Sequence, residues 1–93
     1  MVLRAMPNDL EFSRYGFTIS RRVGHAVVRN RIKRLLREIL RKAPVKPGWD
    51  MVFIARVPAA KAKYEGMEKS VSHLLRRAGL LVGGNEENRP GVD

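Results

Sequence analysis

Hydrophobic and polar residues alternate at every second position over residues 15–20, which is the period of a β-strand. One face of this predicted strand carries the larger apolar side chains, namely Tyr15, Phe17 and Ile19. The other face carries small or polar residues, namely Gly16, Thr18 and Ser20. We therefore predict a strand that packs on a core through one face and presents a small, polar face on its other side.

The hydrophobic period then changes to that of an α-helix. Apolar residues recur at helical spacing, namely at Val28, Ile32, Leu35, Leu36 and Ile39. This stripe predicts a helix over about residues 25–42, with Gly24 as its N-cap and Pro44 preventing its continuation. A second stripe predicts a second helix that Gly79 would end, and its members are Met67, Val71, Leu74, Leu75 and Ala78.

Two further apolar segments predict strands. Residues 2–6 predict a short first strand that ends at a Pro-Asn-Asp turn, and the apolar run 51–55 is typical of a strand covered on both faces. Residues 1–82 therefore predict one α+β domain, in which a small mixed β-sheet packs with two α-helices. We expect residues 83–93, which are rich in Gly, Asn and Glu, to be a disordered tail.

The charge balance is strongly basic, because 19 Lys and Arg stand against 9 Asp and Glu and give a formal net charge of +10. Such a charge on a short chain indicates a polyanionic partner. Apolar stretches are too short to span a membrane, and the start has no secretory apolar region, so we expect no membrane partner. The lack of cysteine excludes disulfides and fits a reducing cytoplasm, where we expect the protein.

Most of the charge lies on the first predicted helix and the residues before it. Glu38 is the one acid between Arg21 and Lys42, a segment with nine basic residues. When angles around the helix axis are counted from Val28 at about 100° per residue, the side opposite the apolar stripe lies between about 140° and 240°. The residues on that side are Asn30, Lys33, Arg34, Arg37 and Arg41. A face that only keeps a helix in solution normally mixes both signs of charge. The dominance of Arg, whose planar fork suits phosphate, favours a nucleic-acid interface.

Other residues with reactive chemistry are few. His25 and His73 have no partner at metal-ligand or catalytic spacing, and the acids are scattered, so we assign no catalytic and no metal-binding residue. We expect the aromatic face of strand 15–20 to be core rather than a base-stacking platform. Its small, polar face either simply contacts water or lets an extended chain lie close to the sheet, and the residues alone leave both possibilities open.

The run Arg22 to Glu38, with its Val-Gly turn and Arg-Asn-Arg helix, resembles the signature of the bacterial ribonuclease P protein component. The resemblance extends to residues 14–20, 48–56 and 74–80, and so covers most of residues 14–81. It implies a ribonucleoprotein endonuclease that removes the 5′ leader from precursor tRNA. The RNA subunit would hold the catalytic Mg²⁺ ions, and the chain itself would carry no cofactor and no catalytic residue.

The resemblance also implies binding residues. Ribonuclease P RNA would be bound by Arg22, Arg29, Asn30, Arg31, Lys33, Arg34, Arg37 and Arg41. The single-stranded leader of precursor tRNA would lie in a cleft formed by Gly16, Thr18, Ser20 and Arg22. We expect a monomer in a one-to-one complex with the RNA.

For the fold, the resemblance implies a ribonuclease P protein-like architecture that a ribosomal protein domain shares. Its strand–helix–strand unit, here 15–21, 25–42 and 50–57, would cross over with left-handed topology, although about 98% of parallel units are right-handed. The family usually begins with a helix that contributes aromatic leader contacts. This chain starts at about the first strand, without that helix. Either the true start lies upstream or the cleft is incomplete, so we assign no aromatic leader contact from that part.

Two rival functions fit the residues alone. A ribosomal or other structural RNA-binding protein would use the same basic helix, and only the Arg-Asn-Arg motif in its setting favours ribonuclease P. A free-standing metal nuclease would need acids such as Asp9, Glu11 or Asp50 to hold magnesium, and their scattered positions argue against it.

Overall fold

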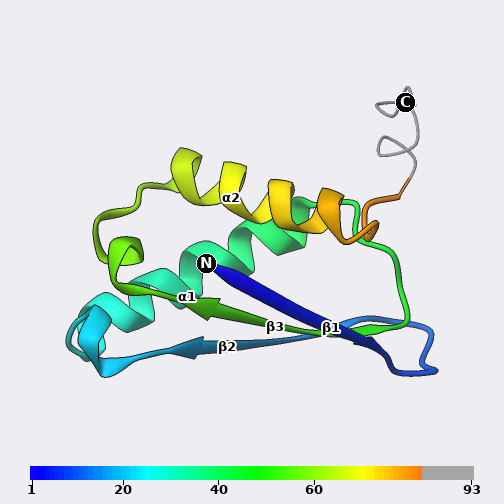
Figure 1. Cartoon of the computed structure of the whole chain (residues 1–93), viewed down its shortest axis with the longest axis horizontal. Helices are drawn as coiled ribbons and strands as arrows, with labels where there is room; N and C mark the ends of the chain where they lie inside the picture. The colour runs from blue at the N-terminus through cyan, green and yellow to red at the C-terminus, as the bar shows by residue number, and fades with distance from the viewer. Residues whose placement is uncertain (83–93) are drawn as a thin grey trace.

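The computed structural model describes residues 1–82, in which a three-stranded sheet forms one layer and two helices form the other (Figure 1). The elements are β1 (Val2–Pro7), β2 (Arg14–Ile19), α1 (Ala26–Lys42), β3 (Trp49–Ala55) and α2 (Tyr64–Arg77). Short 3-10 turns lead into each helix, at Arg21–Val23 and at Val57–Lys61. The predicted α+β class is confirmed, and the predicted tail, residues 83–93, lies outside the described residues.

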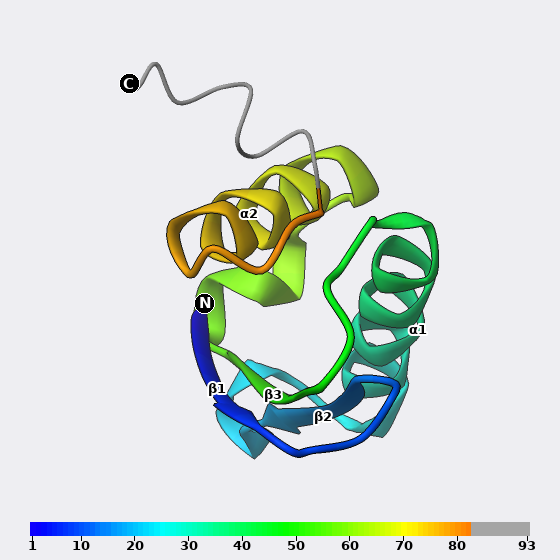
Figure 2. The same cartoon turned by 90° about the vertical axis from the view of Figure 1, so that its right-hand side faces the viewer.

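β3 is the central strand of the sheet. It pairs antiparallel with β1, where Leu3 lies opposite Phe53, and parallel with β2, where Phe17 lies opposite the same residue. The link between β2 and β3 must therefore cross over, and it does so through α1. The two views of the chain show that this crossover is left-handed, as the family resemblance implied and against the general preference (Figures 1 and 2).

The core lies between the helices and one face of the sheet. From β3, Met51, Phe53 and Ala55 point into it and are buried. The remaining side chains with at most 1% exposure come from the helices and the segment after α2, namely Ile32, Leu36, Met67, Val71, Leu75 and Leu80. The predicted stripes therefore face the core, except at the end of α2, where Leu74 is half-buried and Ala78 is exposed. Within residues 1–82, neither helix has the length and apolar character needed to cross a membrane.

The prediction that β3 is covered on both faces is wrong. Val52 is 38% exposed, and Ile54 is only half-buried. Both helices lie on the same side of the sheet, so nothing among the described residues covers the other side (Figure 2). We call this uncovered side the open face; its residues at the centre of the sheet are Arg4, Gly16, Thr18, Val52 and Ile54.

The prediction that Gly24 caps α1 is also wrong. His25 is the N-cap, with extended backbone and no hydrogen bond from its side chain to the helix. Gly24 is needed for close packing instead, because a Cβ atom there would lie 2.8 Å from Cβ of Val28. The predicted end is confirmed: Ala43 is extended before Pro44, as a residue preceding proline prefers to be.

The end of α2 fastens the connection that follows α1. Gly79 adopts φ of +73°, and the N–H groups of Gly79 and Leu80 donate to the carbonyls of Arg76 and Leu75, which is a Schellman motif. The turn directs Leu80 into the core. The chain then pairs with the segment after Pro44, where Lys46 N–H donates to the Leu80 carbonyl at 2.8 Å. The segments that follow the C-terminal ends of α1 and α2 are thus held together.

The two neighbouring leucines of α1 should differ in their effect on stability. Leu36 is fully buried, so Leu36→Ala should cost about 2 to 5 kcal/mol of unfolding free energy. Leu35 is only partly buried, so Leu35→Ala should cost clearly less. Urea unfolding of both variants, followed by circular dichroism, measures the difference. Equal costs would mean that the burial of α1 is not as described.

Candidate nucleic-acid interface

The outer side of α1 carries the basic surface. Asn30, Arg34, Arg37 and Arg41 are exposed, and Lys33 is half-buried beside them. We call these five residues the basic face. Four of them, together with Val27, line a shallow depression on the helix. This placement follows from the apolar stripe, because burying the stripe against the sheet turns the opposite side of the helix outward.

The charges of the basic face are little compensated. In residues 1–82 the ion pairs of α1 are those of Glu38, with Arg41 at 2.7 Å and Lys42 at 3.2 Å. Hydrogen bonds from these two cations lower the pKa of the Glu38 carboxyl, which therefore stays ionised. Arg34 and Arg37 have no ion-pair partner among the described residues. The face keeps a surplus of positive charge.

The start of α1 adds to this positive field. No side chain caps the helix, and its first turn holds no acidic residue. The first backbone N–H groups therefore keep the partial positive charge of the helix dipole. Such an end favours an anion nearby, as the basic face does.

Two of the arginines expected to bind RNA are placed differently from the basic face. Arg31 holds the 3-10 turn before α2, since its guanidinium donates to the carbonyls of Ala60 at 2.6 Å and Ala62 at 3.2 Å. Arg29 is half-buried, and its Nε atom has no hydrogen-bond partner among the described residues. The sequence could not separate Arg31 from its neighbours, because its hydrogen-bond partners lie about 30 positions away in the chain.

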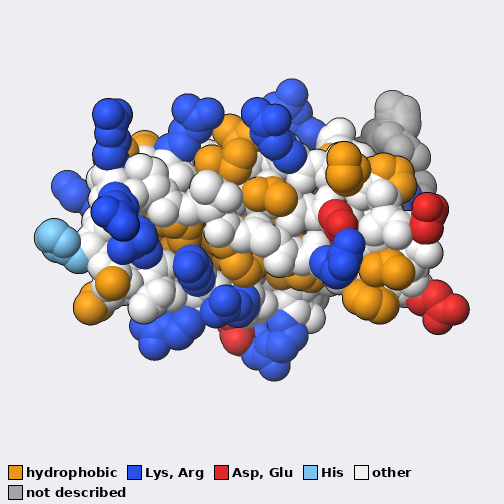
Figure 3. All heavy atoms as spheres, turned by 90° about the horizontal axis from the view of Figure 1, so that it is seen from below, with side chains coloured by type: hydrophobic (Ala, Val, Ile, Leu, Met, Phe, Trp, Pro, Cys, Tyr) orange, Lys and Arg blue, Asp and Glu red, His pale blue; other side chains and the backbone are white. Residues whose placement is uncertain are grey.

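The residues expected to form the leader cleft divide between strand and turn. Gly16 and Thr18 lie on the open face, in register with Val52 and Ile54. Ser20 lies beyond the end of β2, where its hydroxyl oxygen accepts a hydrogen bond from the N–H of Arg22 at 3.1 Å. Arg22 is exposed in the turn that follows. Figure 3 views the open face and shows Lys and Arg side chains along both long edges of the molecule.

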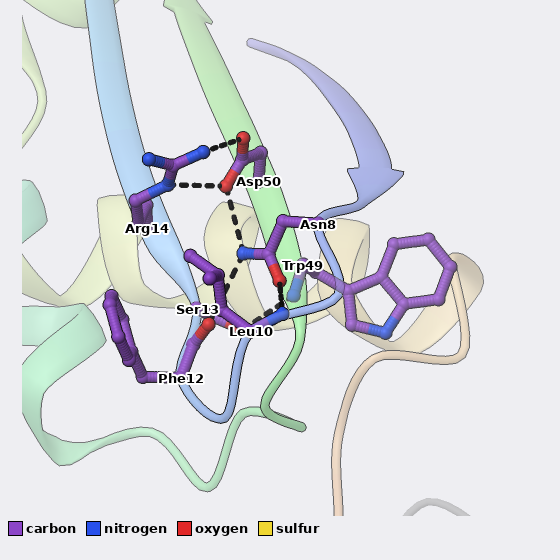
Figure 4. Close-up of polar contacts among 7 residues, drawn as sticks. All are labelled: Asn8, Leu10, Phe12, Ser13, Arg14, Trp49 and Asp50. Atoms are coloured by element: carbon purple, nitrogen blue, oxygen red, sulfur yellow. Dashed lines mark hydrogen bonds and ion pairs between the residues drawn. The ribbon is translucent and has the colours of Figure 1, made fainter.

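A polar network closes the opposite end of the sheet (Figure 4). Asp50 accepts hydrogen bonds from Arg14 at 2.8 and 2.7 Å and from the Asn8 amide at 2.9 Å. These bonds, from Arg14 first and then from Asn8, lower the pKa of Asp50 from 3.8 to about 2. Asp50, one of the acids that a metal nuclease could use, is therefore engaged in linking β2 and β3 with the turn after β1.

The predicted core aromatic Tyr15 is a partial exception to its pattern. It is 37% exposed, while Phe17 and Ile19 on the same face of β2 are packed against the core. Tyr15, Phe17, Arg37, Leu40 and Arg41 line a cleft between β2 and α1. We call this the Tyr15 cleft. The predicted stripe did not include Leu40, which is buried, because this residue lies at the edge of the stripe around the helix axis.

A one-sided sheet whose covering helix carries a basic outer face is typical of an α+β protein that binds nucleic acid. Residues 1–79 match the family model described as Ribonuclease P. The chain is 52% identical over 92 residues to the ribonuclease P protein component of Dehalococcoides mccartyi strain 195, covering 99% of this chain and 77% of the relative. The corresponding protein of Roseiflexus castenholzii is 47% identical over 90 residues, with 94% and 74% covered.

Solved structures agree with the sequence comparison. The RNase P protein of Staphylococcus aureus superposes with a TM-score of 0.75 at 30% identity, covering 85% of this chain and 74% of that one. That of Thermotoga maritima gives 0.74 at 28% identity, covering 81% and 74%. The chain belongs to the family of bacterial ribonuclease P protein components. It is thus the protein subunit of an endoribonuclease that matures the 5′ end of tRNA, and its partner is ribonuclease P RNA.

The Asp50 network should make stability depend on acid pH. Because the pKa of Asp50 is lower in the folded protein than its ordinary value, the ionised carboxylate stabilises the folded state at neutral pH. This contribution to the free energy of unfolding is lost progressively as the pH falls from 3.8 towards about 2 and the carboxylate takes up a proton. Asp50→Asn should therefore be less stable than the parent at neutral pH. The difference should shrink over that interval, where the parent carboxyl also becomes uncharged. Urea unfolding at pH 7, 4 and 2 tests this, and a pH-independent difference would contradict it.

Proposed function

We propose that the basic face of α1 binds ribonuclease P RNA and that the open face receives the single-stranded 5′ leader of precursor tRNA. The supporting observation is the position of α1 over β2, the edge strand that carries Gly16 and Thr18 (Figure 2). One helix and one strand thereby bring the two surfaces next to each other. A protein bound to the RNA subunit through α1 would hold the leader beside it.

On the basic face, the exposed Arg34, Arg37 and Arg41 are suited to phosphate, because each guanidinium can donate two parallel hydrogen bonds. Asn30 adds an uncharged donor and acceptor on the same surface. Arg29 and Lys33, both half-buried, would contribute from the side of the helix. We assign Arg31 a supporting role, because its hydrogen bonds with Ala60 and Ala62 hold the adjoining turn.

On the open face, Gly16 lets an extended strand of RNA approach the sheet closely. Val52 and Ile54 offer an apolar floor for unstacked bases, and Thr18 offers a hydroxyl beside it. Arg22 at the end of β2 would contact leader phosphates. Such contacts would be made with the phosphates and with the flat faces of the bases, which every leader offers. Binding of the leader should therefore depend little on its sequence.

The chemistry of cleavage would belong to the RNA subunit, with Mg²⁺ ions bound there to activate water and stabilise the leaving oxygen. Among residues 1–82 there is no group of three His, Cys, Asp or Glu side chains close enough to hold a metal ion. The protein would contribute binding and positioning, as one monomer per RNA in the cytoplasm, where tRNA precursors are made.

Charge removal on the basic face should weaken RNA binding and reduce its salt dependence. Lys33→Ala with Arg34→Ala should lower affinity for ribonuclease P RNA and reduce the log–log salt slope by roughly 0.7 to 0.9 for each lost phosphate contact. Filter binding between 0.1 and 0.5 M salt measures both quantities. The matched control is Lys69→Ala with Arg76→Ala on the exposed side of α2. An equal loss in both pairs would show attraction by net charge alone.

Reconstituted cleavage tests the leader surface. Ribonuclease P RNA at low magnesium should cleave precursor tRNA faster with the protein than without it, and the protein alone should not cleave.

A variant of the open face tests the leader surface by binding. Gly16→Val should fold normally, because a Cβ atom at this position would come no closer than 3.8 Å to another residue, at Cγ2 of Val52, and a β-branched side chain suits a strand. It should weaken binding of a leader-bearing precursor by roughly 5-fold or more. Mature tRNA, which has no leader, is the control substrate; equal weakening of both would contradict a leader site on the open face.

A further inference from the structure

The Tyr15 cleft combines three kinds of side chain. Tyr15 supplies an aromatic ring that is 37% exposed, Leu40 is a buried apolar residue, and Arg37 and Arg41 supply two exposed guanidinium groups. The cleft lies on the helix-covered side of β2, at the sheet edge, and not on the open face. It is therefore separate from the proposed leader surface.

The cleft is continuous with the basic face through Arg37. This residue lines both the Tyr15 cleft and the depression formed with Asn30, Lys33 and Arg34. Its guanidinium carbon lies 5.7 Å from the ring centre of Phe17, a cation–π contact that holds the side chain at the mouth of the cleft. An RNA strand bound along the basic face would thus pass directly over the opening.

The lining fits one chemical class of ligand. A nucleobase has a flat, weakly polar face that stacks on an aromatic ring, and its phosphate accepts hydrogen bonds from arginine. Tyr15 is suited to stacking, and its hydroxyl stays a proton donor because partial burial raises its pKa. Arg41 is steadied by Glu38 at 2.7 Å, which leaves its remaining N–H groups available for a phosphate.

We propose that the Tyr15 cleft binds one unpaired nucleotide of ribonuclease P RNA, with the base stacked on Tyr15 and the adjoining phosphate bound by Arg37 and Arg41. The proposal rests on the proposed binding of that RNA by the basic face. It adds an uncharged contact, which charge on the helix alone would not supply. Salt dependence separates the two kinds of contact, because stacking releases no counterions.

The test uses full-length protein and ribonuclease P RNA without precursor tRNA, so that the leader cannot contribute. Tyr15→Leu, which keeps an apolar side chain but removes the ring, should weaken binding by roughly 5- to 150-fold, the range expected for one stacked base. The log–log salt slope should not change. Tyr15→Phe keeps the ring and should bind within about 3-fold of the parent. The matched control is Phe12→Leu, since Phe12 is 58% exposed outside the cleft.

Each variant result decides the proposal. Parent-like binding by Tyr15→Leu would overturn it, as would an equal loss in Tyr15→Phe, which would indicate a role for the hydroxyl and not for the ring. An equal loss in Phe12→Leu would show that the effect is not specific to the cleft. If Lys33→Ala with Arg34→Ala leaves the salt slope unchanged, the basic face itself is refuted, and that outcome is independent of Tyr15.

A second measurement keeps Tyr15 in place, so that its result does not depend on whether the Tyr15→Leu variant folds. The chain has two tyrosines, Tyr15 and Tyr64, so protein labelled with 3-fluorotyrosine gives two ¹⁹F signals. Stacking of a base should shift the Tyr15 signal upfield when ribonuclease P RNA is added. Tyr64 serves as the internal reference. Its ring lies under the Lys42 ammonium, with 5.8 Å between Nζ of Lys42 and the centre of the Tyr64 ring. An unshifted Tyr15 signal in the saturated complex would overturn the proposal.

Discussion

The packing of α1 across one face of a three-stranded sheet is the interaction on which the other features depend. Ile32 and Leu36 are fully buried against a sheet centred on Phe53, which is fully buried as well. Burying two such aliphatic side chains contributes about 3 to 6 kcal/mol. Like charges three and four positions apart along the basic face oppose helix formation by about 1 kcal/mol in total. Packing therefore outweighs repulsion, and the helix can carry a surplus of charge on its outer side.

One-sided coverage of the sheet has a second consequence. Because both helices occupy the same side, Gly16, Thr18 and Val52 remain accessible on the other. The parallel pairing of β2 with β3 then forces the chain to cross over through α1, which places the basic face at the edge of the same sheet. The two surfaces are thus adjacent by topology.

Several polar residues hold this arrangement together instead of serving the RNA. Arg31 lies within the Arg-Asn-Arg motif, yet its guanidinium fixes the turn before α2. Asp50 is one of few acids in the chain, and its carboxylate joins Arg14 and Asn8 at the far end of the sheet. Ser20 caps the turn that leads into α1. A basic protein with a small core needs such links, because its net charge opposes a compact state.

The sequence by itself determined the features that depend on local spacing. The period of two over residues 15–20, the helical stripe from Val28 to Ile39 and the position of Gly79 predicted strand, helix and helix end, because backbone geometry ties each of them to residue spacing. The family resemblance supplied the left-handed crossover. Only the tertiary structure decided that β3 is covered on one face alone, that Arg31 contacts Ala60 and that Tyr15 lines a cleft. These outcomes depend on contacts between segments distant in the chain, which no local pattern encodes.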